Sequence, residues 1–266
     1  YYLERIEKYN TPYNCFITFC DDAIEVAKQR DEALSKGEND GLLFGIPVVV
    51  KDNIDIKGLY TTNGHTLDKS KIADSNATVV NYLLEQGAII IGKTNMSTDA
   101  QDARISYSEI KGQTKNAYNT LLASGGSSGG TAVAVSLNFA VAGLGTDTNS
   151  SLRIPAVLNG CVSLRPTLDL IDRTGCTTLN STRDVAGAIT RNVYDQAIMM
   201  DVLTNGQYSY TKNLDKNALD GLKIGILEEL SYATTTSSIT GAEEERNAIA
   251  TRFDMYARTE KHIDNE

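Results

Sequence analysis

Short apolar runs alternate with amphipathic stretches along most of the chain. The apolar runs are rich in Val, Ile and Leu and are bounded by Gly, Asp or Lys, which is typical of buried strands. The amphipathic stretches predict helices, with Asn76 as an N-terminal cap and Gly37 and Gly87 as stops. The pattern predicts strands within residues 42–52, 88–94, 141–147 and 222–227 and helices within residues 1–10, 21–36, 76–87, 130–140 and 193–204.

The order of these elements predicts the fold class. Strands that alternate with helices are typical of α/β proteins, and we expect a central mixed, largely parallel sheet covered by helices. A length of 266 residues with 41% hydrophobic residues is sufficient for a large core. We therefore expect one domain over residues 1–266, with residues 1–36 as an N-terminal helical segment.

The charge and the cysteines narrow the classes of function. A net charge of −9 argues against this chain alone being the main nucleic-acid-binding part, because phosphate binding needs clustered Lys and Arg. No apolar run reaches the ~18 residues of a membrane span. Tyr1 stands where a start Met would be, so we expect an N-terminal piece to be missing, with any targeting signal. The four cysteines, Cys15, Cys20, Cys161 and Cys176, form no CxxC pair, which disfavours a zinc site. Such a small number of cysteines suits a protein of a reducing compartment.

Two serine-bearing turns and one lysine carry the candidate chemistry. The sequence GGSSGG at residues 125–130 precedes a predicted helix, and a second serine cluster at residues 148–151 follows the next predicted strand. Lys51 ends another buried strand. Serine nucleophiles activated by lysine in place of histidine are a known variant of the catalytic triad. A histidine-based triad is not expected, since the two histidines, His65 and His262, are far apart in the sequence.

A lysine acts as a base only when it is neutral at the working pH. The pKa of a solvated lysine is about 10.4, so a surface Lys51 would be protonated and inert. Burial disfavours the ammonium and lowers this pKa, and the apolar run before Lys51 is consistent with burial. A surface lysine at a strand end is the usual interpretation of an isolated lysine, but the two serine turns make it the weaker one here.

One motif, GAIIIGKT at residues 87–94, has the spacing of a phosphate-binding loop. Such a loop needs a glycine-rich turn between a strand and a helix, with N–H groups that point at phosphates. Here the middle residues are Ala-Ile-Ile-Ile, an apolar run that follows a predicted helix. We therefore expect a buried strand and no ATP site at Lys93.

Several ordered blocks of the sequence resemble the amidase signature family, namely residues 45–54, 125–130, 144–156 and 161–167. Within that family, the A subunits of glutamyl-tRNA(Gln) amidotransferases are similar in order and spacing to residues 4–18, 74–97 and 181–200. The resemblance implies the α/β amidase-signature fold. Because members of the family are longer, we expect much of their C-terminal half to be absent from this chain.

The resemblance also assigns roles to three residues. Ser151 matches the family's nucleophile, and Lys51 matches its base. Ser127 matches the serine that follows a cis peptide bond and relays protons between the other two. The oxyanion of the reaction is expected to be bound by the backbone N–H groups of Thr148, Asn149, Ser150 and Ser151.

The chain departs from the family pattern beside these residues. Asn149 and Ser150 stand where the pattern Asp-Thr-Gly-Gly-Ser has two glycines. Glycine adopts positive φ freely and asparagine tolerates it better than serine, so the oxyanion site is retained under strain, rearranged or weakened. Arg165 replaces a lysine of the family's KPT motif, and we expect its role to be structural. Arg153 is expected to organise the loop through its guanidinium donors, with a surface salt bridge as the alternative.

The activity that the resemblance implies is glutamine hydrolysis. The ammonia would pass to a B-type amidotransferase subunit, which amidates Glu-tRNA(Gln) with ATP and Mg and assembles with a small third subunit of C type or fungal F type. No cofactor or metal is expected in this chain. The sequence departures favour a fungal protein of the mitochondrial matrix over a bacterial cytoplasmic one. Two alternatives stay open: an assembly subunit with weakened catalysis, and a stand-alone amidase of another small amide.

Overall fold

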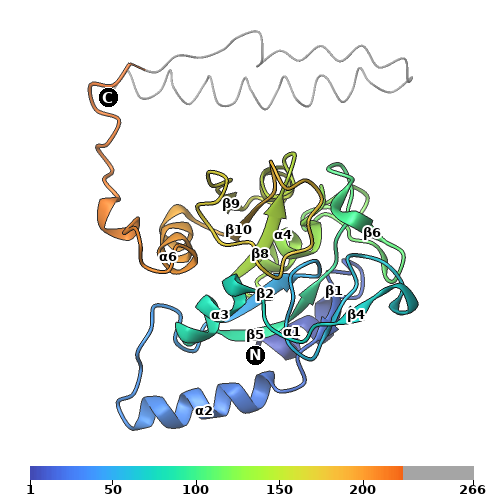
Figure 1. Cartoon of the computed structure of the whole chain (residues 1–266), viewed down its shortest axis with the longest axis horizontal. Helices are drawn as coiled ribbons and strands as arrows, with labels where there is room; N and C mark the ends of the chain where they lie inside the picture. The colour runs from blue at the N-terminus through green and yellow to red at the C-terminus, as the bar shows by residue number, and fades with distance from the viewer. Residues whose placement is uncertain (224–266) are drawn as a thin grey trace. The chain divides into compact units, whose positions relative to one another are not determined.

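The computed structural model describes residues 1–223 of the chain (Figure 1). Residues 1–214 form one compact unit, and residues 215–266 belong to a second. The predicted strand within residues 222–227 lies largely outside the described part. The single domain over residues 1–266 likewise stays a prediction.

A six-stranded mixed sheet forms the centre of the first unit, and two small two-stranded sheets lie outside it. The six strands are β1 (Phe16–Phe19), β2 (Pro47–Lys51), β5 (Ile89–Thr94), β8 (Ala142–Asp147), β9 (Val162–Ser163) and β10 (Val185–Thr190). The small sheets pair β3 (Tyr60–Thr61) with β4 (Lys71–Ile72) and β6 (Tyr107–Ser108) with β7 (Gly112–Gln113).

The strand order in the large sheet is β1-β5-β2-β8-β10-β9. The neighbours β5, β2 and β8 run parallel to one another. The outer strands β1, β10 and β9 are antiparallel to the strands that they join. The prediction of an α/β fold with a mixed sheet is therefore confirmed, with the parallel pairing at its centre.

Helices cover this sheet and connect its strands (Figure 1). They are α1 (Tyr2–Tyr9), α2 (Ala23–Ser35), α3 (Thr78–Glu85), α4 (Gly129–Ser136), α5 (Arg153–Leu158) and α6 (Val193–Leu203), with 3-10 turns η1 (Leu67–Lys69), η2 (Thr98–Ala100) and η3 (Thr211–Asn213). Gly37 and Gly87 follow the ends of α2 and α3 with φ of 79° and 84°, as predicted for residues that end a helix. Within residues 1–223, no helix combines the length and apolar character that crossing a membrane requires.

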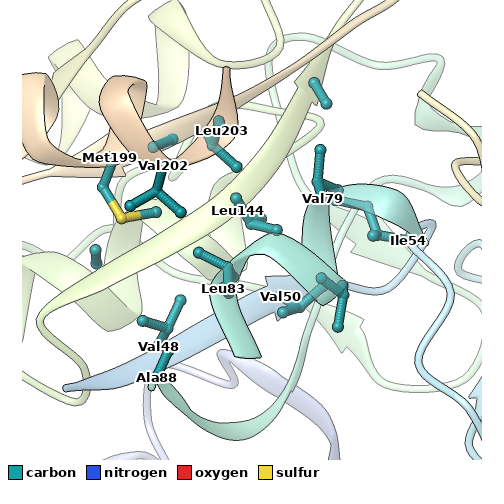
Figure 2. Packing of buried hydrophobic residues seen from close by; sticks show 14 of the residues in the cluster. Val48, Val50, Ile54, Val79, Leu83, Ala88, Leu144, Met199, Val202 and Leu203 are labelled. Atoms are coloured by element: carbon teal, nitrogen blue, oxygen red, sulfur yellow. The ribbon is translucent and has the colours of Figure 1, made fainter. Parts of the chain in front are cut away.

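Strand β2 shows that the sheet is buried on both faces. Val48, Val49 and Val50 are fully buried, as expected for a parallel strand inside a sheet. Val48 and Val50 belong to the apolar cluster that α3 and α6 complete, where Figure 2 shows Leu83 beside them. Val49 belongs to the cluster of the opposite face, with Val133 of α4. The core on both sides holds the end of β2, and therefore Lys51, in one position.

The small residues of α4 let this helix pack closely against the end of β5. A Cβ at Gly130 would lie 2.3 Å from the carbonyl oxygen of Asn95, so only glycine fits there. One residue along, Thr131 Oγ1 lies 2.6 Å from Thr94 Oγ1. The close approach places residues 125–130 beside the carboxyl-terminal ends of the parallel strands.

The other predicted elements within the described residues are confirmed, with three corrections. Residues 1–36 are not wholly helical, because β1 lies between α1 and α2 and pairs with β5. Asn76 does not cap α3, since Ala77 is the N-cap and Asn76 Oδ1 accepts the Lys57 N–H at 2.8 Å. Helix α5 and the strands β3, β4, β6, β7, β9 and β10 were not predicted.

Candidate active site

Lys51 ends β2 with its amine inside the protein. The side chain is fully buried, and Nζ donates hydrogen bonds of 2.7 Å to Ser127 Oγ and 2.7 Å to Thr146 Oγ1. Burial lowers the pKa of Lys51 to about 7, although the charge of Asp147 acts in the opposite direction. A lysine with this pKa is partly neutral near pH 7 and can accept a proton. The prediction of a buried Lys51 is confirmed.

Ser127 follows a cis peptide bond and is fully buried. A Cβ at the preceding Gly126 would lie 2.2 Å from the carbonyl oxygen of Asp102, so this turn requires glycine. The carbonyl oxygen of Ser127 accepts the Ser97 N–H at 3.3 Å and the Ser106 hydroxyl at 3.2 Å. These bonds fix the backbone of Ser127 and leave its hydroxyl directed at Lys51.

Ser151 lies in the loop between β8 and α5 and is 4% exposed. Its carbonyl oxygen accepts the Ser128 N–H at 3.2 Å, which joins the two serine turns directly. Within the described residues, no hydrogen bond joins Ser151 Oγ to Ser127 Oγ. The contact between Ser127 and Lys51 in the predicted relay is therefore present, and the contact between Ser151 and Ser127 stays a prediction.

Asp147 is the centre of the loop that carries Ser151. Its buried carboxylate accepts the N–H groups of Ser150 at 2.8 Å and Leu152 at 3.1 Å. Arg153 Nε donates to it at 3.1 Å and Arg165 Nη1 at 3.3 Å. Burial by itself raises the pKa of Asp147, but these hydrogen bonds outweigh burial and lower it. The expected loop-organising role of Arg153 and the structural role of Arg165 are confirmed.

The backbone of this loop differs from the prediction at one donor. Ser150 has a φ of 86°, the conformation that favours glycine, whereas Asn149 is not among the residues with positive φ. The N–H of Ser150 is already donated to Asp147. Within residues 1–223, no acceptor is found for the N–H groups of Thr148, Asn149 and Ser151. These three groups remain as the proposed oxyanion donors.

Replacing Ser150 with glycine is expected to stabilise the protein by about 1 kcal/mol. A non-glycine residue at such a φ costs about 1–3 kcal/mol, and the greater freedom of glycine in the unfolded chain returns about 0.4–1 kcal/mol of this. Glycine at Asn149 is the matched control and should destabilise. Denaturant unfolding of both variants checks this, and equal effects would contradict the strain assigned to Ser150. Hydrolysis by the Ser150→Gly variant should stay within a few-fold.

A cleft of about 810 Å³ opens beside Thr146 and Thr148. Thr146, which accepts the Lys51 bond, lies in its wall together with Thr148 and Asn53. Asn53 Nδ2 donates to Thr146 Oγ1 at 3.1 Å. Cys176 and Asp184 line the same cleft. A small polar substrate in the cleft would therefore lie next to Thr148 and to Thr146, which binds the Lys51 amine, whereas Ser127 and Ser151 are not among the residues that line the cleft.

The motif at residues 87–94, which has the spacing of a phosphate-binding loop, contains a strand, as predicted. Residues 89–94 form β5, and Lys93 is fully buried within it. Lys93 Nζ donates to the Tyr60 carbonyl oxygen at 2.9 Å and to Thr61 Oγ1 at 3.0 Å, and it pairs with the Asp52 carboxylate at 3.4 Å. The amine is engaged inside the protein, and this backbone does not form a nucleotide-binding turn.

His65 joins two loops near the site. Its Nε2 lies 2.8 Å from Asp99 Oδ1 and its Nδ1 lies 3.3 Å from Glu109 Oε2. The loop of Asp99 begins at Ser97, whose N–H contacts Ser127. The hydrogen bond with Asp99 is the main reason why the pKa of His65 is raised.

Replacing His65 with glutamine is expected to destabilise the protein more in acid than in alkali. A raised folded-state pKa means that the imidazolium stabilises the fold fully below the unfolded pKa of about 6.5, and this contribution is lost as the pH rises through the folded value. The carboxylates are partly exposed, so the effect should be about 1 kcal/mol or less. Unfolding free energies of both proteins at pH 5.5 and 8.5 check this, and a pH-independent difference would contradict it.

Residues 1–251 of the chain match the family described as Amidase. The chain belongs to the amidase family. It is 39% identical over 241 residues to the A subunit of the glutamyl-tRNA(Gln) amidotransferase of Alkaliphilus metalliredigens, an alignment that covers 86% of this chain and 49% of the relative. The chain thus spans about half the length of the curated relatives it matches.

Two solved structures of related proteins show the same fold. The native peptide amidase of Stenotrophomonas maltophilia has a TM-score of 0.73 and 34% identity, over 82% of this chain and 46% of that one. The A subunit of the glutamyl-tRNA(Gln) amidotransferase of Thermotoga maritima has a TM-score of 0.65 and 32% identity, over 76% of this chain and 42% of that one. The family and fold predicted from the motifs are confirmed.

Three polar residues of the site were not predicted. Thr146 accepts the amine of Lys51, Asn53 donates to Thr146, and Asp184 contacts Thr148. Thr146 and Asn53 lie inside motifs that were noted, which was their only signal. Asp184 lies in a block whose resemblance was noted, but no residue type or spacing there indicated a contact with the serine loop.

Proposed function

We propose that this chain carries the amide-hydrolysing site of the A subunit of a glutamine-dependent amidotransferase. In this proposal Ser151 is the nucleophile, Ser127 relays its proton and Lys51 is the base. The observation that supports it best is the 2.7 Å contact between Lys51 Nζ and Ser127 Oγ, made by a buried lysine with a pKa of about 7. A serine hydroxyl can pass its proton to such an amine near neutral pH.

The proposed steps begin at the observed contact between Lys51 and Ser127. Neutral Lys51 takes the proton of Ser127, which takes that of Ser151, and Ser151 Oγ attacks the carboxamide carbon of glutamine. The N–H groups of Thr148, Asn149 and Ser151 are the proposed donors that stabilise the oxyanion, with about 3–4 kcal/mol for each donor in comparable sites. The proton then returns to the amide nitrogen, the C–N bond breaks and ammonia leaves. Water hydrolyses the resulting ester through the same relay and releases glutamate.

The fate of the ammonia is part of the proposal. It passes to a B-type subunit that amidates Glu-tRNA(Gln) with ATP and Mg, and a small subunit of C or fungal F type completes the complex. The identity of 39% with the Alkaliphilus protein supports this assignment. The net charge of −9 agrees with a partner that binds the tRNA. We place the complex in the mitochondrial matrix, with a bacterial cytoplasm as the alternative.

A stand-alone amidase is the second candidate, because the peptide amidase has a TM-score of 0.73, against 0.65 for the Thermotoga protein. The test uses the protein at its natural length, alone and with its partner subunits. Ammonia release is measured from glutamine and from peptide amides, with the Ser151→Ala variant as the blank. Glutamine hydrolysis above the blank supports the proposal, and hydrolysis of peptide amides alone supports the second candidate. Rates equal to the blank with both substrates would indicate an assembly subunit without catalysis.

A further inference from the structure

Asp184 is a buried carboxylate that the proposed mechanism does not use. It is 8% exposed and directly precedes β10. The antiparallel register pairs Val185 of β10 with Asp147 of β8, which places Asp184 beside the residue after Asp147. That residue is Thr148, and its Oγ1 donates a 2.5 Å hydrogen bond to Asp184 Oδ1.

The second oxygen of Asp184 holds a different segment. Asp184 Oδ2 accepts the N–H groups of Leu179 and Asn180, both at 2.7 Å. Leu179, Asp184 and Thr148 all line the cleft. One carboxylate therefore joins the loop that carries Ser151 to a segment that forms part of the cleft wall.

The charge of Asp184 is balanced differently from that of Asp147. Asp147 is paired with Arg153 and Arg165. Among the described residues, no cation forms an ion pair with Asp184, and its oxygens receive only neutral hydroxyl and amide donors. Because no cation neutralises this carboxylate, its negative charge acts on nearby groups inside the protein. Lys51 is within that field, since Asp184 is one of the charges that raise its pKa against the effect of burial.

We propose that Asp184 is a positioning residue of the amidase site, which holds Thr148 and the adjoining oxyanion donors at a fixed place against the cleft wall. The proposal rests on the proposed function for the chemistry that the loop performs. Both oxygens of Asp184 accept hydrogen bonds, so the carboxylate binds three donors at once and keeps the Thr148 hydroxyl in the donor role. Asparagine offers one acceptor oxygen, so its NH₂ would face either the Thr148 hydroxyl or the two N–H groups of Leu179 and Asn180.

The test compares Thr148→Val, Thr148→Ser and Asp184→Asn in the full-length protein. Valine removes the hydroxyl at nearly constant size, and it should lower kcat for amide hydrolysis by about 10- to 100-fold, the cost of a small misplacement of reacting groups. Serine restores the hydroxyl and should return kcat to within a few-fold of the parent. Asp184→Asn should lower kcat and also move the acid limb of the pH profile to lower pH, because the loss of a nearby negative charge disfavours the Lys51 ammonium. The acid limb of Thr148→Val should not move.

A second readout separates this inference from the proposed function. A fluorophosphonate probe reacts with an activated serine: the Oγ–P bond forms, fluoride leaves and the relay removes the proton, with no amide required. Labelling of Ser151 should be slowed by Thr148→Val and restored by Thr148→Ser. This pattern without glutamine hydrolysis would retain the inference and refute the proposed substrate.

Several results would overturn the role of Asp184. One is a Thr148→Ser variant that is as impaired as Thr148→Val, and another is a folded Asp184→Asn variant with an unchanged kcat and pH profile. A parent protein that neither reacts with the probe nor hydrolyses an amide would overturn both proposals. Where Asp184→Asn fails to fold, the pair of Thr148 variants decides the test.

Discussion

Replacing Lys51 with methionine is expected to lower the rate of glutamine hydrolysis by roughly 10²- to 10⁴-fold, the contribution of a general base. Methionine has a similar length and is apolar, so it fills the buried position without accepting a proton. The hydroxyls of Ser127 and Thr146 each lose a 2.7 Å contact with Nζ. Initial rates of ammonia release from glutamine, measured with saturating substrate, check this prediction.

The pH dependence of kcat/KM in the parent protein is a second test of Lys51 as the base. Since burial lowers the pKa of Lys51 to about 7, kcat/KM should rise with pH and reach half of its plateau near that value. The sign follows from the role of Lys51, because the base works only after it has lost its proton. A profile that is flat from pH 5.5 to 8.5 would contradict the assignment of Lys51 as the base.

Arginine at position 51 is the matched control, because its guanidinium stays charged at every working pH. Both variants should show a loss of roughly 10²-fold or more, and the loss in the methionine variant is not explained by unfolding if that variant keeps its thermal stability. A depressed lysine pKa means that the ammonium opposes folding, so stability rises with pH between about 7 and the unfolded value near 10.4. Methionine at position 51 carries no charge, so this contribution of the buried ammonium to the pH dependence of stability disappears. Retained activity in either variant would refute the proposed role.

The sequence predicted the parallel centre of the sheet because β2, β5 and β8 are buried on both faces. Such strands are continuous apolar runs, and Val48–Val50 is the clearest of them. Strand β10 is equally buried but is built from Ala, Gly and Thr as well as Val and Ile. Small residues suit its close packing against β8 and carry little strand signal. Strand β1 is a four-residue element between two helices, and its pairing with β5 is a long-range contact.

The site was predictable where a motif marks it and not where tertiary pairing creates it. Lys51 and Ser127 were named from the motifs, and the structure brings them to 2.7 Å. The contact of Asp184 with Thr148 depends on the antiparallel pairing of β10 with β8, so missing that strand meant missing the contact. The N–H of Ser150 was expected to be free, but the buried Asp147 carboxylate binds it. The conformation of this loop is set by the buried carboxylate of Asp147, which requires hydrogen-bond donors, rather than by local sequence preference.

Replacing Lys93 with methionine is expected to destabilise the protein by about 3–5 kcal/mol, the usual cost of removing one partner of a buried ion pair. Lys93 and Asp52 are both fully buried, and Nζ lies 3.4 Å from Asp52 Oδ1. The other carboxylate oxygen accepts the Thr62 N–H at 3.1 Å and the Thr62 hydroxyl. Without Lys93, neutral donors would have to compensate the buried charge of Asp52, the residue that directly follows Lys51. Denaturant unfolding of the parent and the variant measures the loss.

The pairing can be isolated with a double-mutant cycle. Asp52→Asn keeps an acceptor for Thr62 and removes the charge, so the double variant contains no buried charge at this position. It should be more stable than the sum of the single losses predicts, by about 1–3 kcal/mol. The free energies of unfolding come from denaturant titration of all four proteins. Additive losses would show that Lys93 acts through its own bonds to Tyr60 and Thr61 and not through Asp52.

The pH dependence of the Lys93→Met loss gives an independent check on the buried charge. Burial already raises the pKa of Asp52, and the charge of Lys93 is the main influence that opposes the rise. Without that charge the folded-state pKa should rise further above the unfolded value of about 3.9, so the folded protein binds a proton that the unfolded chain does not. The stability lost in the variant should therefore shrink as the pH falls below neutrality, whereas the loss in the double variant should be independent of pH. A loss in Lys93→Met that stays constant from pH 8 to pH 5 would mean that Asp52 is not left charged inside the protein, and the ion pair would not be the reason why Lys93 is needed.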